Sequence, residues 1–142
     1  LIFGRSHEEI LPMLSMYAGM GAVLGHNFPF YLKFKGGKGI AATAGLFLAT
    51  NIWMALIAFA VFLVIVGITR YVSVGSIALV VLFVIEVVVY GQSGGFGISG
   101  TPLYEMYGIA VFLMVLAVYK HRTNIKRLCN GTENKLKFGK EK

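Results

Sequence analysis

Charge is scarce in this chain of 142 residues. Only 13% of the residues are charged, and just six are acidic, whereas 57% are hydrophobic. A soluble domain carries about twice that fraction of charge, so the composition excludes an ordinary soluble domain. The one cysteine, Cys129, excludes an internal disulfide. No spacing of cysteine and histidine residues indicates a metal site.

The hydrophobic residues come in long blocks, and the mean hydropathy is +0.76. Five apolar segments are visible, at residues 10–24, 40–50, 52–68, 74–90 and 106–119. A helix of about 17 residues rises about 25 Å, close to the roughly 30 Å of a bilayer's hydrocarbon core. The sequence therefore predicts an all-α, polytopic membrane helix bundle that forms a single integral membrane domain over residues 1–142.

The apolar segment at residues 40–50 is too short to cross a bilayer, because 11 residues rise only about 16 Å as a helix. If residues 40–68 formed one long helix, Arg70 and the basic C-terminal tail would both lie on the outer side, opposite the basic loop at residues 25–39. We therefore expect a turn at Thr50–Asn51. A short or broken helix is tolerated at membrane depth where it is buried in protein or lines a cavity.

Positive charge falls almost entirely on one side of the membrane if the five segments alternate in direction. That side would hold the following lysine and arginine residues: Lys33, Lys35, Lys38, Arg70, Lys120, Arg122, Lys126, Arg127, Lys135, Lys137, Lys140 and Lys142. The other side would hold Arg5 with the acidic residues Glu8, Glu9 and Glu105. The positive-inside rule predicts that the basic side, with the tail at residues 120–142, is cytoplasmic.

A basic, glycine-rich loop, GHNFPFYLKFKGGKGIAAT at residues 25–43, lies between the first two apolar segments. Gly36, Gly37 and Gly39 surround Lys38 and leave room for backbone N–H groups to approach a ligand. A helix beginning near residue 40 would add its partial positive charge, so we expect an anion site for the phosphate of a metabolite or lipid headgroup. The spacing is not that of a Walker A loop, so nucleotide binding is not expected.

Two further polar clusters fall on the basic side. In TRYVSVGS, residues 69–76, Ser73 and Ser76 share one helical face; ordinary N-capping by Ser73 is the structural alternative to a ligand contact. In KHRTNIKRLCNGTE, residues 120–133, His121 and Asn124 share a face that continues to Arg127. The alternative for this second cluster is a juxtamembrane helix that only binds anionic lipid.

Three other residues have two interpretations each. His26 either points into the anion site or caps the end of the first apolar segment. Arg70 either contacts a substrate or serves as a positive-inside anchor. Glu86 is the one ionisable residue well inside an apolar segment, and it is either functional or a carboxylate that snorkels to the outer interface or is paired locally.

Together and in this order, the three motifs resemble those of the bacterial acyl-phosphate-dependent glycerol-3-phosphate acyltransferases. The likeness covers most of residues 10–133. It implies a multi-pass enzyme of the bacterial plasma membrane that transfers a fatty acyl group from acyl phosphate to the 1-hydroxyl of glycerol 3-phosphate. The products would be lysophosphatidic acid and phosphate, in the first step of phospholipid synthesis. The implied partners are both substrates and membrane lipid, with no cofactor, metal or nucleic acid.

The resemblance also implies roles for single residues. The phosphate-binding loop would be Gly36, Gly37, Lys38 and Gly39. A substrate would be hydrogen-bonded by Ser73 or Ser76. Asn124 and His121 would orient glycerol 3-phosphate, and His121 is the best local candidate for a catalytic general base. Possible further contacts are His26, Arg70 and Arg127.

The chain departs from the family pattern at its start. The family carries a more N-terminal helix pair with a G-S-G-N-x-G-A-T-N motif, which is absent here, so we expect the chain to be an N-terminally truncated fragment. Two other functions are weighed against the acyltransferase. A small anion or metabolite transporter would need polar groups near the bilayer midplane, and usually internal repeats. A non-catalytic scaffold with a basic tail would leave the glycine-lysine loop unexplained.

Overall fold

The computed structural model describes residues 11–34 and 36–137, and the regular structure of that part is entirely helical. The elements in chain order are α1 (Leu11–Asn27), η3 (Phe30–Leu32), α2 (Ile40–Thr50), α3 (Ile52–Thr69), α4 (Val72–Gln92), α5 (Thr101–Lys120) and α6 (Arg122–Cys129). The all-α prediction is confirmed. Lys35 of the basic loop and the last five residues of the basic tail lie outside the described residues.

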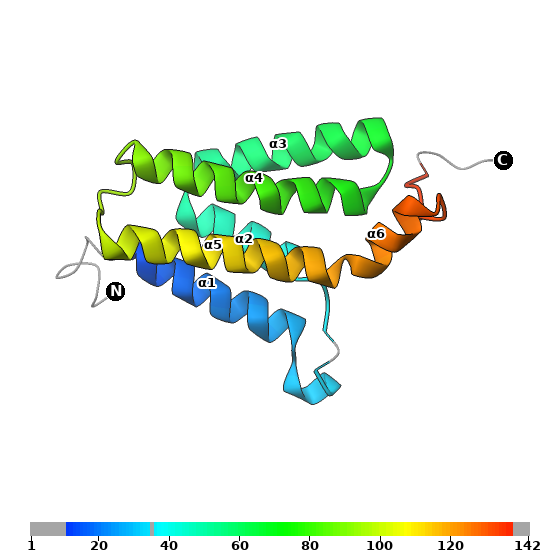
Figure 1. Ribbon diagram of the computed structural model, residues 1–142, viewed down its shortest axis with the longest axis horizontal. Coiled ribbons are helices and arrows are strands. Elements are labelled where there is room, and N and C mark those ends of the chain that lie inside the picture. The colour runs from blue at the N-terminus through cyan, green and yellow to red at the C-terminus, as the bar shows by residue number, and fades with distance from the viewer. Residues whose placement is uncertain (1–10, 35, 138–142) are drawn as a thin grey trace.

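Three of the described helices, α3, α4 and α5, are long and apolar enough to cross a membrane. They lie roughly side by side along the long axis of the molecule (Figure 1). The five apolar segments expected from the sequence correspond to α1 through α5. As expected, α2 has 11 residues and is too short to cross a bilayer. This chain is therefore a helical membrane protein in which a short helix accompanies full-length spans.

The turn expected at Thr50–Asn51 is present, and Asn51 is the residue that makes it. Its backbone N–H bonds to the carbonyl of Phe47 and ends α2. Its side-chain oxygen accepts hydrogen bonds from the backbone N–H groups of Trp53, at 2.8 Å, and Met54, at 3.3 Å, and so caps α3. As a result α2 and α3 run in opposite directions (Figure 1).

The short helix α2 packs against α1, α3 and α4. Phe47 of α2 is 1% exposed, and its ring meets the ring of Phe83 from α4 edge to face, with centroids 4.2 Å apart. On the other side of α2, the Leu46 side chain fills the space where a side chain on Gly19 of α1 would stand. Packing from both sides fixes the position of α2, and with it the position of its N-terminus.

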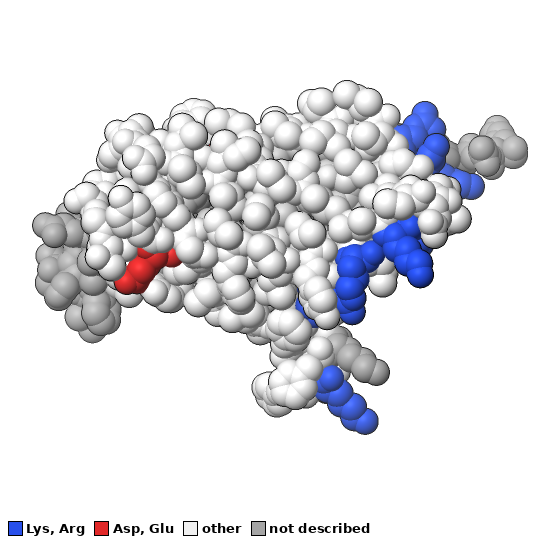
Figure 2. Space-filling model, viewed as in Figure 1, with Lys and Arg blue, Asp and Glu red and all other residues white. Residues whose placement is uncertain are grey.

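The two ends of the bundle differ in charge. In Figure 2, lysine and arginine side chains gather at the end where α6 and the loop before α2 lie, and the acidic patch lies at the other end. At that other end, near the start of α5, the Tyr17 hydroxyl donates to Glu105 at 2.8 Å. The sequence-based expectation that positive charge collects at one end is met. We refer to it as the basic end.

Glu86 lies on α4, away from the basic end. Both of its carboxylate oxygens are buried, and neither has a hydrogen-bond partner among the described residues. The local pairing that the sequence suggested for Glu86 is therefore not found in this part of the chain.

Candidate functional site

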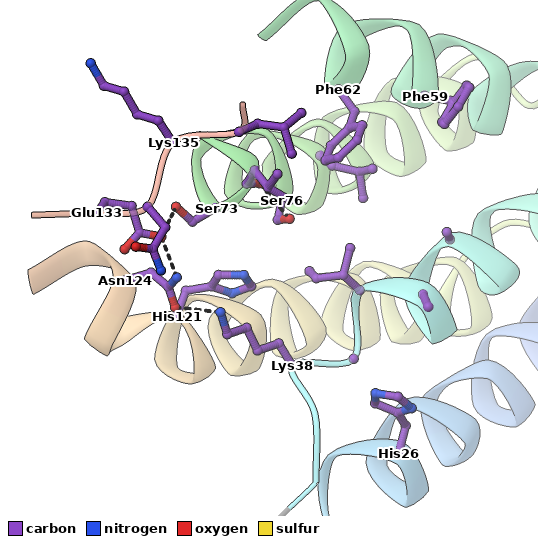
Figure 3. A pocket seen from close by; sticks show the side chains of 18 residues that line it. His26, Lys38, Phe59, Phe62, Ser73, Ser76, His121, Asn124, Glu133 and Lys135 are labelled. Atoms are coloured by element: carbon purple, nitrogen blue, oxygen red, sulfur yellow. Dashed lines mark hydrogen bonds between the residues drawn. The ribbon is translucent and has the colours of Figure 1, made fainter. Parts of the chain in front are cut away.

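A cavity of about 730 Å³ opens at the basic end, and all three polar motifs contribute to it. Figure 3 shows side chains from the loop before α2, from α4, from the α5–α6 junction and from the C-terminal segment converging there. The polar and charged lining residues are His26, Lys38, Ser73, Ser76, His121, Asn124, Glu133, Asn134 and Lys135. Residues more than 100 positions apart in sequence, such as His26 and Lys135, thus face one space.

The glycines of the basic loop have different structural roles. A Cβ on Gly36 would overlap the backbone carbonyl oxygens of His26 and Asn27, and one on Gly37 would overlap the His26 imidazole. These two glycines let the loop pack against the end of α1, and neither lines the cavity. Gly39 does line it, and has a φ of 78° as the residue that precedes α2. The structure therefore places Gly39 and Lys38 at the cavity, with Gly36 and Gly37 behind them.

The N-terminus of α2 also faces the cavity, through Ile40 and Ala41. Gly39 supplies no side-chain cap, whereas its carbonyl accepts hydrogen bonds from the backbone N–H of Thr43, at 2.8 Å, and from the Thr43 hydroxyl, at 2.9 Å. The first backbone N–H groups of a helix have no partner within the helix, and they attract anions. With Lys38 directly before them, they form a positively polarised wall of the cavity.

Lys38 reaches across the cavity to α6. Its Nζ donates to Oδ1 of Asn124 at 2.6 Å, and Nδ2 of Asn124 donates to Oε1 of Glu133 at 2.7 Å (Figure 3). Asn124 is 5% exposed. An ammonium group has three N–H donors, so Lys38 has two more to offer a ligand.

Glu133 is a cavity-lining residue that the sequence interpretation did not single out. Oε1 also accepts from the Ser73 hydroxyl at 2.9 Å, and Oε2 accepts from Nε of Arg127 at 2.7 Å. The hydrogen bond from Asn124, followed by those from Arg127 and Ser73, lowers the pKa of Glu133 to about 2. Glu133 is therefore ionised. An acidic residue among the lysines and arginines of the basic tail was the signal in the sequence.

Glu133 also changes the interpretation of its partners. The N-cap of α4 is Tyr71 and the helix begins at Val72, so the N-capping alternative for Ser73 was wrong. The Ser73 hydroxyl instead donates to the carboxylate, while the Ser76 hydroxyl donates to the carbonyl of Val72 at 2.9 Å. Both serines line the cavity, but of the two only Ser73 is hydrogen-bonded to Glu133.

The segment that carries Glu133 continues across the cavity as part of its wall. The backbone N–H of Leu136 bonds to the carbonyl of Arg70 at 2.7 Å, and the Lys135 ammonium lies 5.6 Å from the centre of the Tyr71 ring. Arg70 thus contributes through its backbone, and neither Arg70 nor Arg127 is among the residues that line the cavity. Both arginines hydrogen-bond to the segment at residues 133–136 and so fix its position.

His121 lies at the junction of α5 and α6 and is 2% exposed. Its Nδ1 lies 2.7 Å from the carbonyl oxygen of Ala117. A carbonyl only accepts, so Nδ1 carries the proton and Nε2 is left as an acceptor. Burial lowers the pKa of His121, and the nearby positive charge of Lys38 adds to this effect. The geometry therefore holds a neutral imidazole beside Lys38 and Asn124.

His26 of α1 lines the cavity from the side opposite α4 (Figure 3). Its imidazole lies against Gly37. Of the two positions considered for it, the structure shows the one that faces the site.

Lys120 was not singled out from the sequence. Its Nζ donates to the carbonyl of Asn27 at 2.8 Å and lies 4.0 Å from the centre of the Phe28 ring. Lys120 thereby ties the start of the basic loop to α5, one residue before His121.

Away from Lys38 the cavity is apolar. This half is lined by Ala44, Phe59, Phe62 and Leu79. A second, smaller cavity of about 180 Å³ lies among apolar side chains of α2, α3 and α4, and shares Ala44, Phe59 and Leu79 with the first. The site thus joins a polar, positively charged end to an apolar recess between helices.

A comparison with protein families matches residues 2–131 to the family described as Glycerol-3-phosphate acyltransferase. This chain belongs to that family. A glycerol-3-phosphate acyltransferase of Thermoanaerobacter sp. (strain X514) is 39% identical over 122 residues, which cover 86% of this chain and 57% of the relative. One of Chlorobaculum tepidum is 38% identical over 140 residues, covering 90% and 60%. The chain thus spans somewhat more than half the length of these relatives.

The fold is similar to that of PlsY (YgiH), described as an integral membrane glycerol 3-phosphate acyltransferase. Its lysophosphatidic acid form matches with a TM-score of 0.76 and 32% identity, over 97% of this chain and 64% of PlsY. Its glycerol 3-phosphate form matches with the same TM-score over 97% and 62%. The membrane-bundle fold expected from the sequence is the fold of this acyltransferase.

Proposed function

We propose that the protein transfers a fatty acyl group from acyl phosphate to the 1-hydroxyl of glycerol 3-phosphate. The observation that carries this proposal is the composition of the cavity. Lys38 and the N-terminus of α2 suit a phosphate, and the apolar half between α2, α3 and α4 suits a fatty chain. A site for a soluble metabolite alone would have no use for that apolar half.

The polar end would hold phosphate groups in the following way. Lys38 donates to phosphate oxygens with the N–H groups that Asn124 leaves free, and the first N–H groups of α2 add further donors. Gly36 and Gly37 act indirectly, by seating this loop against α1. Ser76 faces the same space and can hydrogen-bond a substrate. Ser73 contributes by binding Glu133, which in turn orients Asn124.

The chemistry needs little activation, because acyl phosphate already contains a good leaving group. The 1-hydroxyl oxygen attacks the acyl carbonyl carbon, the bond between that carbon and the phosphate oxygen breaks, and inorganic phosphate leaves. Nε2 of His121 accepts a hydrogen bond from the hydroxyl and orients it. The proton passes either to Nε2 or to the departing phosphate. Positioning and phosphate neutralisation supply most of the rate in either case.

The basic end would face the cytoplasm of a bacterial cell, following the positive-inside rule. Acyl phosphate would then enter the cavity from the bilayer and glycerol 3-phosphate from the cytoplasm. Transport is the weaker hypothesis, because the polar residues of the cavity lie at one end of the bundle and not at the bilayer midplane. Membership of the acyltransferase family disfavours it further.

The proposed activity is tested with purified protein in vesicles, supplied with acyl phosphate and radiolabelled glycerol 3-phosphate. We expect lysophosphatidic acid and inorganic phosphate to form in equal amounts. Uptake of label into the vesicle lumen without lipid product would identify a transporter. Release of phosphate without lysophosphatidic acid would also contradict the proposal.

Replacing His121 with Gln in the same assay separates a base from a positioning group. If His121 takes the proton, the maximal rate falls even at saturating substrate, and the acidic limb of the pH–rate profile disappears. That limb lies below the ordinary histidine range, because burial lowers the pKa of His121. If His121 only positions the hydroxyl, the apparent affinity falls and the pH profile stays. An unchanged rate and affinity would remove His121 from the site.

A further inference from the structure

The loop between α1 and α2 exposes an unusual group of side chains. Phe30, Tyr31, Leu32 and Phe34 are 80%, 73%, 51% and 65% exposed. These residues do not line the cavity, and the proposed reaction gives them no role. Figure 1 shows the loop projecting sideways from the bundle, at about the level where α5 ends. We call residues 28–34 the aromatic loop.

The aromatic loop is an organised structure. The carbonyl of Pro29 accepts hydrogen bonds from the backbone N–H of Leu32, at 3.1 Å, and of Phe34, at 3.0 Å, and Lys33 N–H bonds to the Phe30 carbonyl at 3.1 Å. At its base, the Lys120 ammonium lies over the Phe28 ring. The apolar tip is therefore held out by a fixed backbone.

The backbone of the tip is also strained. Lys33 and Phe34 have φ values of 52° and 60°, a conformation that L-residues with side chains seldom adopt. A left-handed residue of this kind brings its Cβ too close to the following carbonyl oxygen, which costs free energy. Two in succession persist only where something offsets that cost. Exposing the rings of Phe30, Tyr31 and Phe34 to water would cost further free energy. We therefore expect the tip of the loop to lie in an apolar environment.

We infer that the aromatic loop inserts into the headgroup–acyl boundary of the membrane on the basic side of the protein. Phenylalanine and tyrosine with interspersed lysine are typical of interfacial anchors. The exposed apolar side chains of α3 are mostly aliphatic, for example Ile57, Leu63 and Val64, as suits the hydrocarbon core. The sideways projection at the end of α5 places the loop where the interface begins (Figure 1).

The charge of this end of the molecule supports a lipid partner over a protein one. Lys33 stands among the aromatic side chains of the loop, and the basic end as a whole is rich in lysine and arginine (Figure 2). Anionic headgroups attract such a surface, while the aromatic rings pack among the upper methylene groups. The inference does not rest on the proposed acyl transfer, because a scaffold or transporter could be anchored in the same way.

Depth-dependent tryptophan quenching tests the inference. The protein is reconstituted in vesicles of zwitterionic and anionic phospholipid with Phe30→Trp as its sole tryptophan, Trp53 being replaced by Phe. Matched vesicles carry lipids brominated either near the headgroup or deep in the acyl chains. We expect emission shifted to short wavelength and a larger loss of intensity with the shallow bromines than with the deep ones.

The native Trp53, 71% exposed at the start of α3, is the control with Phe30 intact and shows that the bromines reach an exposed side chain of a span. Long-wavelength, unquenched emission from Phe30→Trp would place the loop in water and overturn the inference. Short-wavelength but unquenched emission would mean that protein covers the loop, and stronger quenching by the deep bromines would place it in the hydrocarbon core. Both results would overturn the inference as well.

Discussion

Two glycine-rich segments of this chain are similar in composition and opposite in structure. The loop at residues 36–39 packs against the end of α1 so closely that a Cβ on Gly36 or Gly37 has no room. The loop at residues 93–100 contains Gly94, Gly97 and Gly100, all with positive φ and with open space where a Cβ would stand. The first loop uses glycine for close packing, and the second uses it mainly to turn, with Gly95 packed against the Tyr90 ring as its exception.

The difference shows where glycine content indicates function. In the loop at residues 36–39, close packing positions Lys38 against the cavity, so the shape of the loop is part of the site. In the loop at residues 93–100, each turn could be kept at a modest conformational cost with another residue. Glycine content alone does not distinguish these two loops. They are distinguished by Lys38 and by the close packing of the first loop against the end of α1.

The largest expected effect is that of Gly36→Ala. The added methyl group would overlap the carbonyl oxygens of His26 and Asn27, so the loop must move and carry Lys38 with it. A displacement of about 1 Å at a reacting centre costs on the order of 100-fold in rate. We expect a loss of that size in kcat/KM for acyl transfer.

The matched control is Gly21→Ala in α1, where a Cβ would meet nothing within 4 Å. It should retain activity, since alanine is also the better helix former. Normal turnover in the Gly36→Ala protein would show that the tight loop is not part of the site.

A smaller effect is expected from Glu133→Gln. The carboxylate accepts from Ser73, Asn124 and Arg127, whereas a carboxamide would turn an NH2 group toward one of these donors. Asn124 would lose its fixed orientation, and we expect kcat/KM to fall by roughly tenfold.

The pH dependence of unfolding checks the same residue. Because the pKa of Glu133 is lowered from 4.5 to about 2 in the folded protein, its contribution to stability is complete above pH 4.5 and is lost as the pH falls toward 2. Thermal unfolding of the Glu133→Gln protein in detergent should lack this part of the acid dependence. An identical dependence in the two proteins would contradict the role assigned to Glu133.

The smallest effect is expected from Gly97→Ala. Its φ of 67° is unfavourable for alanine by about 1–2 kcal/mol, but there is space for the methyl group. The unfolding temperature should drop by a few degrees, with no change in the kinetic constants for either substrate. A kinetic defect as large as that of Gly36→Ala would mean that the two loops do not differ in the way described.

The helices could be predicted because their signals are local. Blocks of apolar residues marked α1 to α5, and the bounds of α2 were predicted residue for residue. The turn at Asn51 followed from length and from the charge rule, since no continuous helix over residues 40–68 satisfied both. The direction of the bundle relative to the cytoplasm stays a prediction.

The network within the site could not be predicted, because its partners are far apart in the chain. Ser73 and Glu133 are separated by 60 positions, and Lys38 and Asn124 by 86. Spacing on a helix placed His121 and Asn124 on one face, but it could not show that Glu133 folds back onto Asn124. For the same reason, spacing could not show that Gly36 and Gly37 pack against the end of α1, and their predicted role in binding phosphate stays a prediction.

The central claim is that the tight loop holds Lys38 as a phosphate ligand, and the affinity for glycerol 3-phosphate tests it most directly. Calorimetric titration of the purified protein should show binding weakened roughly tenfold to 150-fold by Lys38→Met, since a charge-assisted hydrogen bond is worth about 1.5–3 kcal/mol. Lys126→Met removes the same charge from the exposed face of α6, outside the cavity, and should leave the affinity unchanged. Equal affinities in the two variants would contradict the account.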